Sequence, residues 1–402
     1  MKKILYVSPI NSRSGYGDHA REFVKYLLTL KENYEIDILA TPWGSNPTTA
    51  LEDDVELANK ISDMFVNKKD IKKDYDLYVQ LGLPTEFQCV GKTNIGITAG
   101  VETDKVTKEF VKGCNQMDTI IVPSEFTRKS FESTEYTENK SKLKVVTPIE
   151  VVHEYASCDF YNDTLKESDS TFLNSVKEDF CFLFVGQWVS STSDDGGRKN
   201  LKSLIRTFKH TFSSDKFKNK PALVLKTNGT NFSISDFNKT KDDLRKVIAN
   251  ESLPSSPNIY LLHSDMTHHE LVSLYRHPKV KVFASHTRGE GFGRPALEAT
   301  LSGIPVLTSF WSGHLDFLNK DQSLLIPGEL ECVGVSNDMF ASDAHWIQVD
   351  EMASSARMKN VFTDYEKYKT LALDLQTSNR SKFTEESAFE KYTKIFEKLL
   401  GQ

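Results

Sequence analysis

The chain has 402 residues, of which 39% are hydrophobic, and its formal net charge is −6. This length predicts two domains, and the hydrophobic content is too high for global disorder. The modest negative charge argues against a protein that is held on nucleic acid mainly through phosphate contacts. The five cysteines are scattered without a CxxC pair, which indicates neither a zinc site nor a disulfide framework. No apolar run approaches the length of a membrane span, so we expect a cytoplasmic protein.

In the first half of the chain, short apolar runs alternate with helical patterns, which predicts parallel strands joined by helices. The first predicted strand, residues 4–8, leads into a glycine-bearing loop at 14–18 and then into a helix. The apolar residues of that helix recur at helical spacing from Ala20 to Leu27. Further strands are predicted at residues 36–39, 77–81, 95–98, 119–122 and 143–146.

The second half repeats this pattern after a polar stretch at residues 163–179, which indicates a linker or a surface helix. A predicted strand at 180–185 is followed by a glycine, a polar loop and a helix with an apolar stripe from Leu201 to Phe208. From about residue 350 the pattern is helical to the end of the chain. Further strands are predicted at residues 222–225, 258–262, 280–284 and 305–308. We therefore predict an α/β chain with two Rossmann-like domains facing a cleft, at residues 1–160 and 161–380.

The most informative string covers residues 289–299, Gly-Glu-Gly-Phe-Gly-Arg-Pro-Ala-Leu-Glu-Ala. A predicted strand runs into a glycine-rich loop, and Pro295 stands where the first turn of a helix favours proline. Glu290 then lies on the loop, at the sheet edge where ligands bind in α/β proteins, and Glu298 lies about one turn into the helix. Two glutamates at this spacing also occur by chance on a solvated helix face. The strand, loop and helix context favours a ligand site instead.

This string resembles the donor site of the retaining GT-B glycosyltransferases of family 4, where an E-x7-E motif precedes a short Gly-x-Pro-Val strand. In this chain Glu290 and Glu298 are followed by Gly-Ile-Pro-Val at residues 303–306. The resemblance implies that Glu290 contacts hydroxyls of the donor sugar and that Glu298 holds the ribose of the nucleotide. It further implies the GT-B architecture, with a C-terminal helix at residues 381–402 that crosses back to pack on the N-terminal domain.

A basic pair, Arg198 and Lys199, follows the strand predicted at 180–185. At the matching place the family carries a basic pair that grips the donor diphosphate, so the resemblance implies this role here. Relatives often place an arginine directly after the glycine of the strand, but this chain has Gln187 there. An exposed basic helix start is the alternative interpretation. Together with Glu290, Arg198 and Lys199 are the predicted catalytic residues.

Weaker signals complete the predicted site. Residues that follow two strands of the second half are positioned to line a base pocket, and the glycines of the first loop are expected to face the donor, although a simple turn is their commoner use. Tyr16 and Glu102 are candidates on the acceptor side, and Glu102 is equally compatible with a helix cap. The predicted donor-binding residues are Glu298, Gly291, Phe292, Gly293, Lys226, Asn228, Asp265, Met266, Gly15 and Gly17.

The resemblance implies transfer from a nucleotide diphosphate sugar, with no required cofactor or metal. UDP and GDP are candidate nucleotides, and the sequence specifies neither the base nor the sugar of the donor. No metal site is predicted, because His263, His268 and His269 lack an acidic or cysteine partner at ligand spacing. The acceptor is unknown and is a glycan, a lipid, a protein or a modified nucleic acid base.

Three other functions compete with the transferase. The first is a nucleotide-sugar epimerase of the same fold, and the second is a non-catalytic nucleotide-sugar or glycan-binding protein. The third is a dinucleotide-dependent oxidoreductase, which needs a third glycine after Gly15 and Gly17, where this chain has Ala20.

Overall fold

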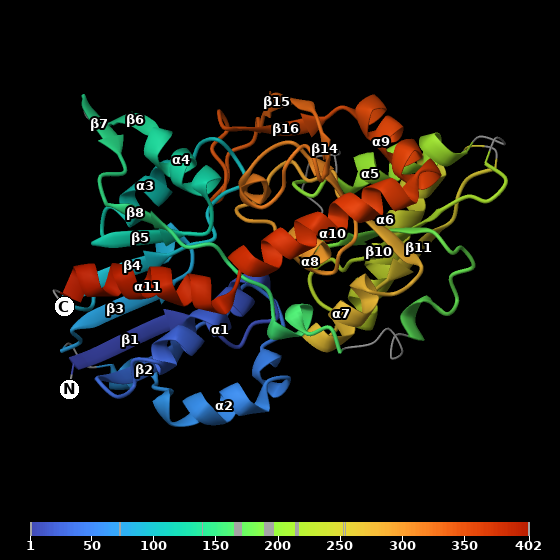
Figure 1. Cartoon of the computed structure of the whole chain (residues 1–402). Coiled ribbons are helices and arrows are strands. Elements are labelled where there is room, and N and C mark those ends of the chain that lie inside the picture. Colours follow the sequence, from blue (N-terminus) through green and yellow to red (C-terminus); the bar gives the residue numbers. More distant parts are fainter. Residues whose placement is uncertain are drawn as a thin grey trace. The chain divides into compact units, whose positions relative to one another are not determined.

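The structure is a computed structural model of the chain (Figure 1). The chain forms two compact units, each with its own parallel sheet. Unit 1 comprises Met1–Glu154, Cys332–His345 and Thr384–Gln402, and unit 2 comprises Tyr155–Glu331 and Trp346–Phe383. The structure describes residues 2–71, 74–138, 140–164, 171–188, 197–213, 217–251, 253 and 255–400.

The sheet of unit 1 has six parallel strands in the order β2-β1-β3-β4-β5-β8. Its strands are β1 (Lys2–Ser8), β2 (Tyr34–Ala40), β3 (Leu77–Leu81), β4 (Thr93–Ile97), β5 (Thr119–Val122) and β8 (Ile149–Val151). Its helices are α1 (Gly15–Leu28), α2 (Val55–Ile61), α3 (Lys108–Cys114), α4 (Glu125–Ser133) and α11 (Glu385–Leu400). Most of these strands are apolar runs, because a parallel sheet is covered on both faces.

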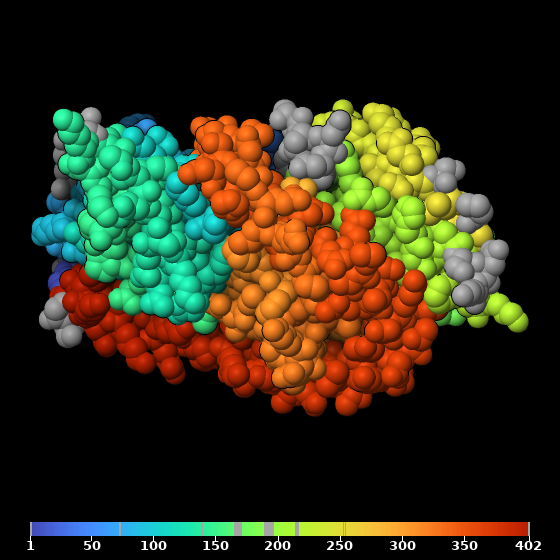
Figure 2. Space-filling model, turned by 90° about the horizontal axis from the view of Figure 1, so that it is seen from above, coloured from blue at the N-terminus to red at the C-terminus, as the bar shows by residue number. Residues whose placement is uncertain are grey.

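Helices cover both faces of this sheet. The ring of Tyr6 in β1 lies 5.2 Å from that of Phe23 in α1, and Phe23 lies 5.0 Å from Tyr392 in α11. The neighbouring residue Leu5 points to the opposite face, into a core that includes Phe110 of α3. The C-terminal helix therefore packs on the N-terminal helix, and its outer side lies at the surface (dark red in Figure 2).

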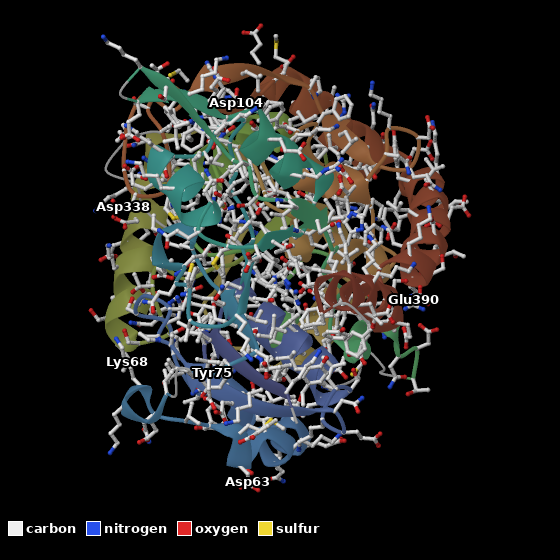
Figure 3. The ribbon with its side chains drawn as sticks, turned by 90° about the vertical axis from the view of Figure 1, so that its left-hand side faces the viewer. Asp63, Lys68, Tyr75, Asp104, Asp338 and Glu390 are labelled. Carbon is white, nitrogen blue, oxygen red and sulfur yellow. The ribbon has the colours of Figure 1, made fainter. Side chains whose placement is uncertain are left out.

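Side chains of unit 1 also tie its strands together. Tyr75, which precedes β3, is buried and donates its hydroxyl to Asp37 of β2 at 2.6 Å. Because β1 lies between β2 and β3, this bond spans β1. By contrast, Asp63 and Lys68 extend from the surface of the unit (Figure 3).

Two elements of unit 1 differ from the prediction. The sequence predicts a sheet strand at residues 143–146, but the strand found there, β7 (Ser141–Lys144), pairs antiparallel with β6 (Glu135–Glu138) in a separate hairpin. Helix α1 begins at Gly15, because the Ser14 hydroxyl accepts a hydrogen bond from the Gly17 amide and caps the helix. The glycines predicted to form a loop therefore lie in the first helical turn.

The sheet of unit 2 has six parallel strands in the order β11-β10-β9-β12-β13-β14. Its strands are β9 (Cys181–Val185), β10 (Ala222–Lys226), β11 (Ile259–Leu262), β12 (Val280–Ala284), β13 (Val306–Ser309) and β14 (Leu324–Ile326). Its helices are α5 (Leu201–Phe212), α6 (Ile234–Asn250), α7 (His268–Tyr275), α8 (Arg294–Leu301), α9 (Glu351–Thr363) and α10 (Tyr365–Lys382). A further two-stranded sheet consists of β15 (Gly328–Cys332) and β16 (His345–Val349).

Unit 2 also has helices on both faces of its sheet (Figure 1). The ring of Phe182 in β9 lies 5.6 Å from that of Phe208 in α5. Leu183 points to the other face and joins a core that includes Leu297 of α8 and Leu375 of α10. Both units are thus parallel sheets between helical layers, and the predicted α/β class with two Rossmann-like domains is confirmed.

The unit boundaries differ from the predicted domain boundaries. The first change of unit falls at Glu154, and Cys332–His345 returns to unit 1, although the sequence analysis assigns these residues to the second domain. Hydrogen bonds explain the return. The His345 amide donates to the carboxylate of Asp104 at 2.7 Å, and the Asp104 amide donates to the carbonyl of His345 at 3.0 Å. Lys105 adds an ion pair with Asp343.

Among the residues that the structure describes, no helix is both long enough and apolar enough to cross a membrane.

Candidate functional site

The strand order of unit 2 reverses between β9 and β12, which lie side by side in the sheet. In open parallel sheets such a reversal leaves a crevice at the carboxyl ends of the two strands, where ligands bind. The segment after β9 leads to Arg198 and Lys199, and the segment after β12 leads to Glu290. The topology therefore brings the predicted catalytic residues to one sheet edge.

Arg198 and Lys199 lie in a turn directly before α5. Two residues with left-handed backbone frame this turn, Gly197 with φ 65° and Asn200 with φ 48°. Asparagine is one of the few residues besides glycine that accept this conformation readily. The Asn200 amide closes the turn by donating to the carbonyl of Gly197 at 3.1 Å. The turn thus presents the two basic side chains ahead of the helix.

Glu290 lies between these basic side chains. One of its carboxylate oxygens accepts from Arg198 Nη1 at 3.0 Å and the other from Lys199 Nζ at 2.6 Å. The side chain of Glu290 is only 13% exposed. Burial alone would raise the pKa of Glu290, but the charges of Lys199 and Arg198 outweigh burial and lower this pKa to about 2. The three side chains form a cluster of two positive charges and one negative charge.

A small cavity of about 10 Å³ adjoins this cluster and is lined by Lys199, Glu290 and His314, among others. It has room for about one water molecule. The Nε2 of His314 lies 2.7 Å from the carbonyl oxygen of Ser309 and therefore carries a proton. Burial lowers the pKa of His314, so its ring is neutral. Its Nδ1 is then an acceptor, and it has no hydrogen-bond partner among the described residues.

The second glutamate of the motif, Glu298, is 7% exposed in α8. Burial lowers the pKa of Lys226, at the end of β10, while the carboxylates of Asp265 and Glu298 act against this shift. Burial also raises the pKa of Tyr275 well above its ordinary value, and the charge of Glu298 adds to that effect. Lys226, Asp265 and Glu298, which come from three separate segments, therefore lie close enough to interact electrostatically.

Other residues of the motif build the loop itself. Gly293 precedes α8 with φ 99°, a conformation that disfavours any side chain, and Gly291 lies in the same loop. Phe292 is 3% exposed, and its ring lies 5.2 Å from that of Phe317 and 6.1 Å from that of Phe383. The sequence analysis counts Phe292 among the donor-binding residues. In the structure its side chain anchors the loop in the core.

Two further donor-side predictions have structural contacts in the same unit. Met266 is partly buried against the core that includes Phe292. The carbonyl of Asn228 accepts a hydrogen bond from the amide of Trp188 at 2.8 Å, which links the loops after β10 and β9.

A buried network that the sequence analysis misses supports the loop after β12. Ser203 of α5 donates its hydroxyl to Glu351 at 2.7 Å, so it accepts from Nδ1–H of His286 at 2.9 Å. The Nε2 of His286 in turn accepts from the hydroxyl of Ser354 at 2.7 Å. Burial lowers the pKa of His286 to about 4, which keeps the ring neutral. Ser203, His286 and Ser354 are far apart in the sequence, so no sequence pattern indicates that they form a network.

The acceptor-side candidates lie at the carboxyl edge of the sheet in unit 1. The Tyr16 hydroxyl accepts from the Ala99 amide at 3.2 Å and lies 3.3 Å from the hydroxyl of Thr98. Burial raises the pKa of Tyr16, and the charge of Glu102 contributes to the shift. The ring of Tyr16 stacks on Trp43, which follows β2, with the ring centroids 3.9 Å apart. The sequence analysis misses Trp43, because a lone tryptophan in a loop carries no pattern.

The glycines near Tyr16 have a different explanation from the predicted one. A Cβ atom at Gly17 would lie 1.9 Å from the carbonyl oxygen of Ser12, so the close approach of two backbone segments requires glycine there. Gly15 is exposed and forms the first residue of α1. The glycine pattern therefore does not by itself indicate phosphate binding.

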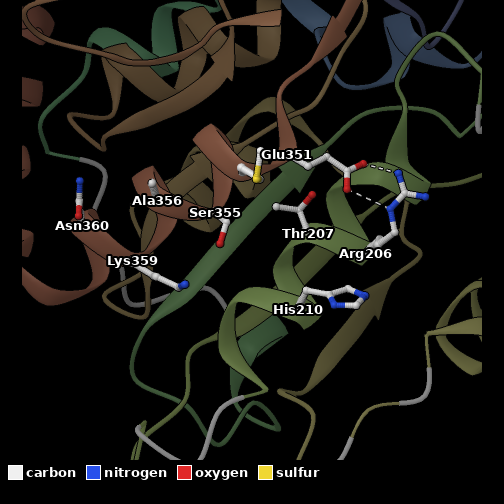
Figure 4. A pocket seen from close by; sticks show the side chains of 9 residues that line it. Arg206, Thr207, His210, Glu351, Ser355, Ala356, Lys359 and Asn360 are labelled. Atoms are coloured by element: carbon white, nitrogen blue, oxygen red, sulfur yellow. Dashed lines mark hydrogen bonds and ion pairs between the residues drawn. The ribbon is translucent and has the colours of Figure 1, made fainter.

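A larger hollow of about 680 Å³ lies between α5 and α9 (Figure 4). Arg206, His210, Glu351 and Lys359 are among its lining residues. The guanidinium of Arg206 is paired with Glu351, and the ring of His210 lies 2.9 Å from Glu251. None of the predicted site residues lines this hollow, so we place the candidate site at the strand reversal.

Known proteins resemble part or all of this chain. Residues 166–331 match the family model of glycosyl transferases group 1, and this range contains Arg198, Lys199, Glu290 and Glu298. No curated protein matches the chain in sequence.

Several solved structures resemble the whole chain. Sucrose-phosphate synthase from Thermosynechococcus elongatus is 12% identical with a TM-score of 0.59, and the match covers 100% of both chains. Anabaena HepE in complex with UDP-glucose is 12% identical with a TM-score of 0.62, over 99% of this chain and 100% of that one. An α,α-trehalose-phosphate synthase from Burkholderia xenovorans in complex with glucose-6-phosphate is 11% identical with a TM-score of 0.63, again over 99% and 100%. The region that carries the site thus matches glycosyl transferases group 1, and the chain as a whole has the fold of the GT-B glycosyltransferases.

Proposed function

We propose that the protein transfers a sugar from a nucleoside diphosphate sugar to an acceptor hydroxyl and that the anomeric configuration is retained. One observation carries the proposal: Glu290 bridges Arg198 and Lys199 at the strand reversal of unit 2. Two basic side chains and a carboxylate at this place suit a ligand with both a diphosphate and sugar hydroxyls. The match to glycosyl transferases group 1 over this region supports the same chemistry.

In the proposed reaction Arg198 and Lys199 bind the diphosphate and stabilise the charge that develops on it as the bond to the sugar breaks. Fixed cations in a partly buried site are effective here because they need no reorganisation during the reaction. The turn between Gly197 and Asn200 fixes the backbone of the two residues, and their side chains are paired with Glu290 before the donor arrives. We propose that this electrostatic stabilisation operates without a metal ion.

Glu290 has two successive partners in this proposal. Without a donor it neutralises part of the charge of Arg198 and Lys199, and the adjoining cavity has room for only about one water molecule. When a donor binds, its phosphates take over the two cations, and the ionised carboxylate accepts hydrogen bonds from the sugar hydroxyls. Before the donor binds, a pKa of about 2 keeps Glu290 ionised throughout the physiological range.

We propose Glu298 as the ligand of the ribose, with Lys226 and Asp265 beside the nucleotide. The electrostatic contact of Lys226 with both carboxylates supports a common role at one end of the donor. UDP is the proposed nucleotide, because it occurs in the name of a solved structure with the same fold, the HepE complex with UDP-glucose. The acceptor is a hydroxyl of a glycan, a lipid, a protein or a modified nucleic acid base.

The decisive experiment measures nucleotide release from UDP-, GDP-, ADP- and dTDP-sugars, with EDTA present and without added acceptor. The wild type is expected to hydrolyse one donor slowly. Glu290→Gln and Lys199→Ala are expected to lose this activity, because each removes one side of the charged cluster. Lys239→Ala on the exposed side of α6 is the matched control and is expected to keep it.

Two results would contradict the proposal. The first is a wild type that releases no nucleotide and is not stabilised thermally by any of the four nucleotides, which favours a different ligand. The second is nucleotide release that survives in both site variants, which locates the reaction elsewhere. Once an acceptor is found, NMR of the anomeric proton of the product tests retention.

A further inference from the structure

Ser312 has a backbone conformation that side chains rarely adopt. Its φ is 79° and its ψ is −163°, a combination that is almost confined to glycine. The residue is a serine, it is 3% exposed, and it lies between β13 and the short turn Gly313–Asp316. Strain of this kind persists only where the surrounding contacts impose it.

Two hydrogen bonds connect this strained segment to the backbone of Glu290. The Glu290 amide donates to Ser312 Oγ at 2.9 Å, and the Gly313 amide donates to the carbonyl of Glu290 at 2.9 Å. Both backbone polar groups of Glu290 are thus held by consecutive residues. A glycine at position 312 would permit the second bond but not the first, because the first requires a hydroxyl.

The loop that carries Glu290 is also bonded to the basic turn before α5. The amide of Arg288 donates to the carbonyl of Arg198 at 2.9 Å. The loop that carries Glu290 is therefore joined to the basic turn at one point and to Ser312 at another. The second attachment depends on a side chain in a backbone conformation that would suit glycine better.

We infer that Ser312 is a positioning residue whose strained backbone carries its hydroxyl to the amide of Glu290 and thereby fixes the carboxylate against the donor sugar. The inference deepens the proposed function and rests on it for the role of Glu290. It adds that the serine costs stability at this position, while its hydroxyl serves the reaction.

Two variants separate the strain from the hydrogen bond. Ser312→Gly removes the hydroxyl and relieves the strain, whereas Ser312→Ala removes the hydroxyl and keeps the strain. At ordinary positions alanine gives the more stable protein, since glycine loses more conformational entropy on folding. Here we expect the reverse, with Ser312→Gly melting about 2–4 °C above Ser312→Ala.

Turnover is expected to depend on the presence of the Ser312 hydroxyl and not on the melting temperature. Both variants should release UDP from the donor about tenfold more slowly, because a misplaced carboxylate no longer orients the sugar. The increase in melting temperature on adding UDP alone should stay at the wild-type value in both, since UDP lacks the transferred sugar that Glu290 is proposed to bind. Ser309→Ala is the matched control, because the buried hydroxyl of Ser309 has no hydrogen-bond partner among the described residues.

The outcomes are distinct. Wild-type turnover in Ser312→Gly, or turnover that falls only in Ser312→Ala, overturns the positioning role while leaving the proposed function intact. A higher melting temperature for Ser312→Ala than for Ser312→Gly contradicts the claim that the backbone of Ser312 is strained. A wild type that releases no nucleotide from any of the four donors overturns the proposed function and the catalytic part of this inference together, and the order of melting temperatures still decides whether Ser312 is strained.

Discussion

The carboxyl edges of the two sheets are built from different chemistry. In unit 2 the edge carries the charged cluster of Arg198, Lys199 and Glu290, most of it shielded from solvent. In unit 1 the corresponding edge carries the stacked rings of Tyr16 and Trp43 beside hydroxyl and backbone groups. A similar arrangement of strands and helices thus carries a paired charge cluster at one edge and stacked aromatic rings at the other. The fold determines where a site lies, and the side chains determine what it binds.

The largest expected effect tests how the charged edge is anchored. Phe292→Ala should reduce the free energy of unfolding by about 3–5 kcal/mol, because it empties a ring position in the core below the loop. Phe292→Leu should cost much less, since it keeps most of the apolar volume. Chemical denaturation of both variants measures the difference. If Phe292→Ala is as stable as the wild type but binds UDP more weakly, Phe292 binds the donor and does not anchor the loop.

The second prediction tests whether charge distinguishes the two edges. Arg198→Ala should lower kcat for donor hydrolysis about 10²-fold, since one of the two groups that stabilise the leaving diphosphate is lost. Arg245→Ala on α6 is the control, because its side chain is 67% exposed and pairs only with a neighbour on the same helix among the described residues. Equal activities of the two variants would show that the basic pair does not act in catalysis.

The third prediction follows from the lowered pKa of Glu290. A carboxylate whose pKa is lowered in the folded state stabilises the protein above its unfolded pKa, and this stabilisation is lost as the pH falls toward about 2. The difference in unfolding free energy between the wild type and Glu290→Gln should therefore shrink by about 2 kcal/mol between about pH 6 and about pH 3. Urea denaturation at several pH values measures it. A difference that is independent of pH would contradict the ion pairs.

The smallest effect is expected at the aromatic edge of unit 1. Tyr16→Phe keeps the stacking on Trp43 but leaves the Ala99 amide without its acceptor, which should cost about 1 kcal/mol of stability. Donor hydrolysis should stay within about twofold of the wild type, because the sequence analysis assigns Tyr16 to the acceptor side. A large loss of UDP release in this variant would show that the edge of unit 1 also acts on the donor.

The sequence predicts most strands of both sheets because long buried runs are easily recognised. The predicted strands at 77–81 and 119–122 coincide with β3 and β5, which are buried at every residue. The sequence analysis misses β8 and β14, which have three residues each, too few to form a period that indicates a strand. It also assigns residues 143–146 to the sheet, because apolar residues in a surface hairpin resemble those of a short sheet strand.

The candidate site is less accessible to sequence reasoning. The motif directs attention to Glu290, Arg198 and Lys199, but the ion pairs among them join residues about ninety positions apart, and no local pattern contains that contact. His286 and Trp43 are single residues in loops, so only the folded chain reveals their partners. The strained backbone of Ser312 is equally invisible, because a serine gives no sign of a conformation that normally belongs to glycine.

The chain passes from one unit to the other four times, after residues 154, 331, 345 and 383. Neither unit is therefore a continuous stretch that can be produced by cutting the chain once. A fragment ending at residue 154 would lack α11, and the aromatic side chains of α1 that pack against Tyr392 and Phe396 would be exposed to water. Any exchange of the second unit between relatives of this protein must therefore carry over two separate segments and leave the intervening residues 332–345 with the first unit.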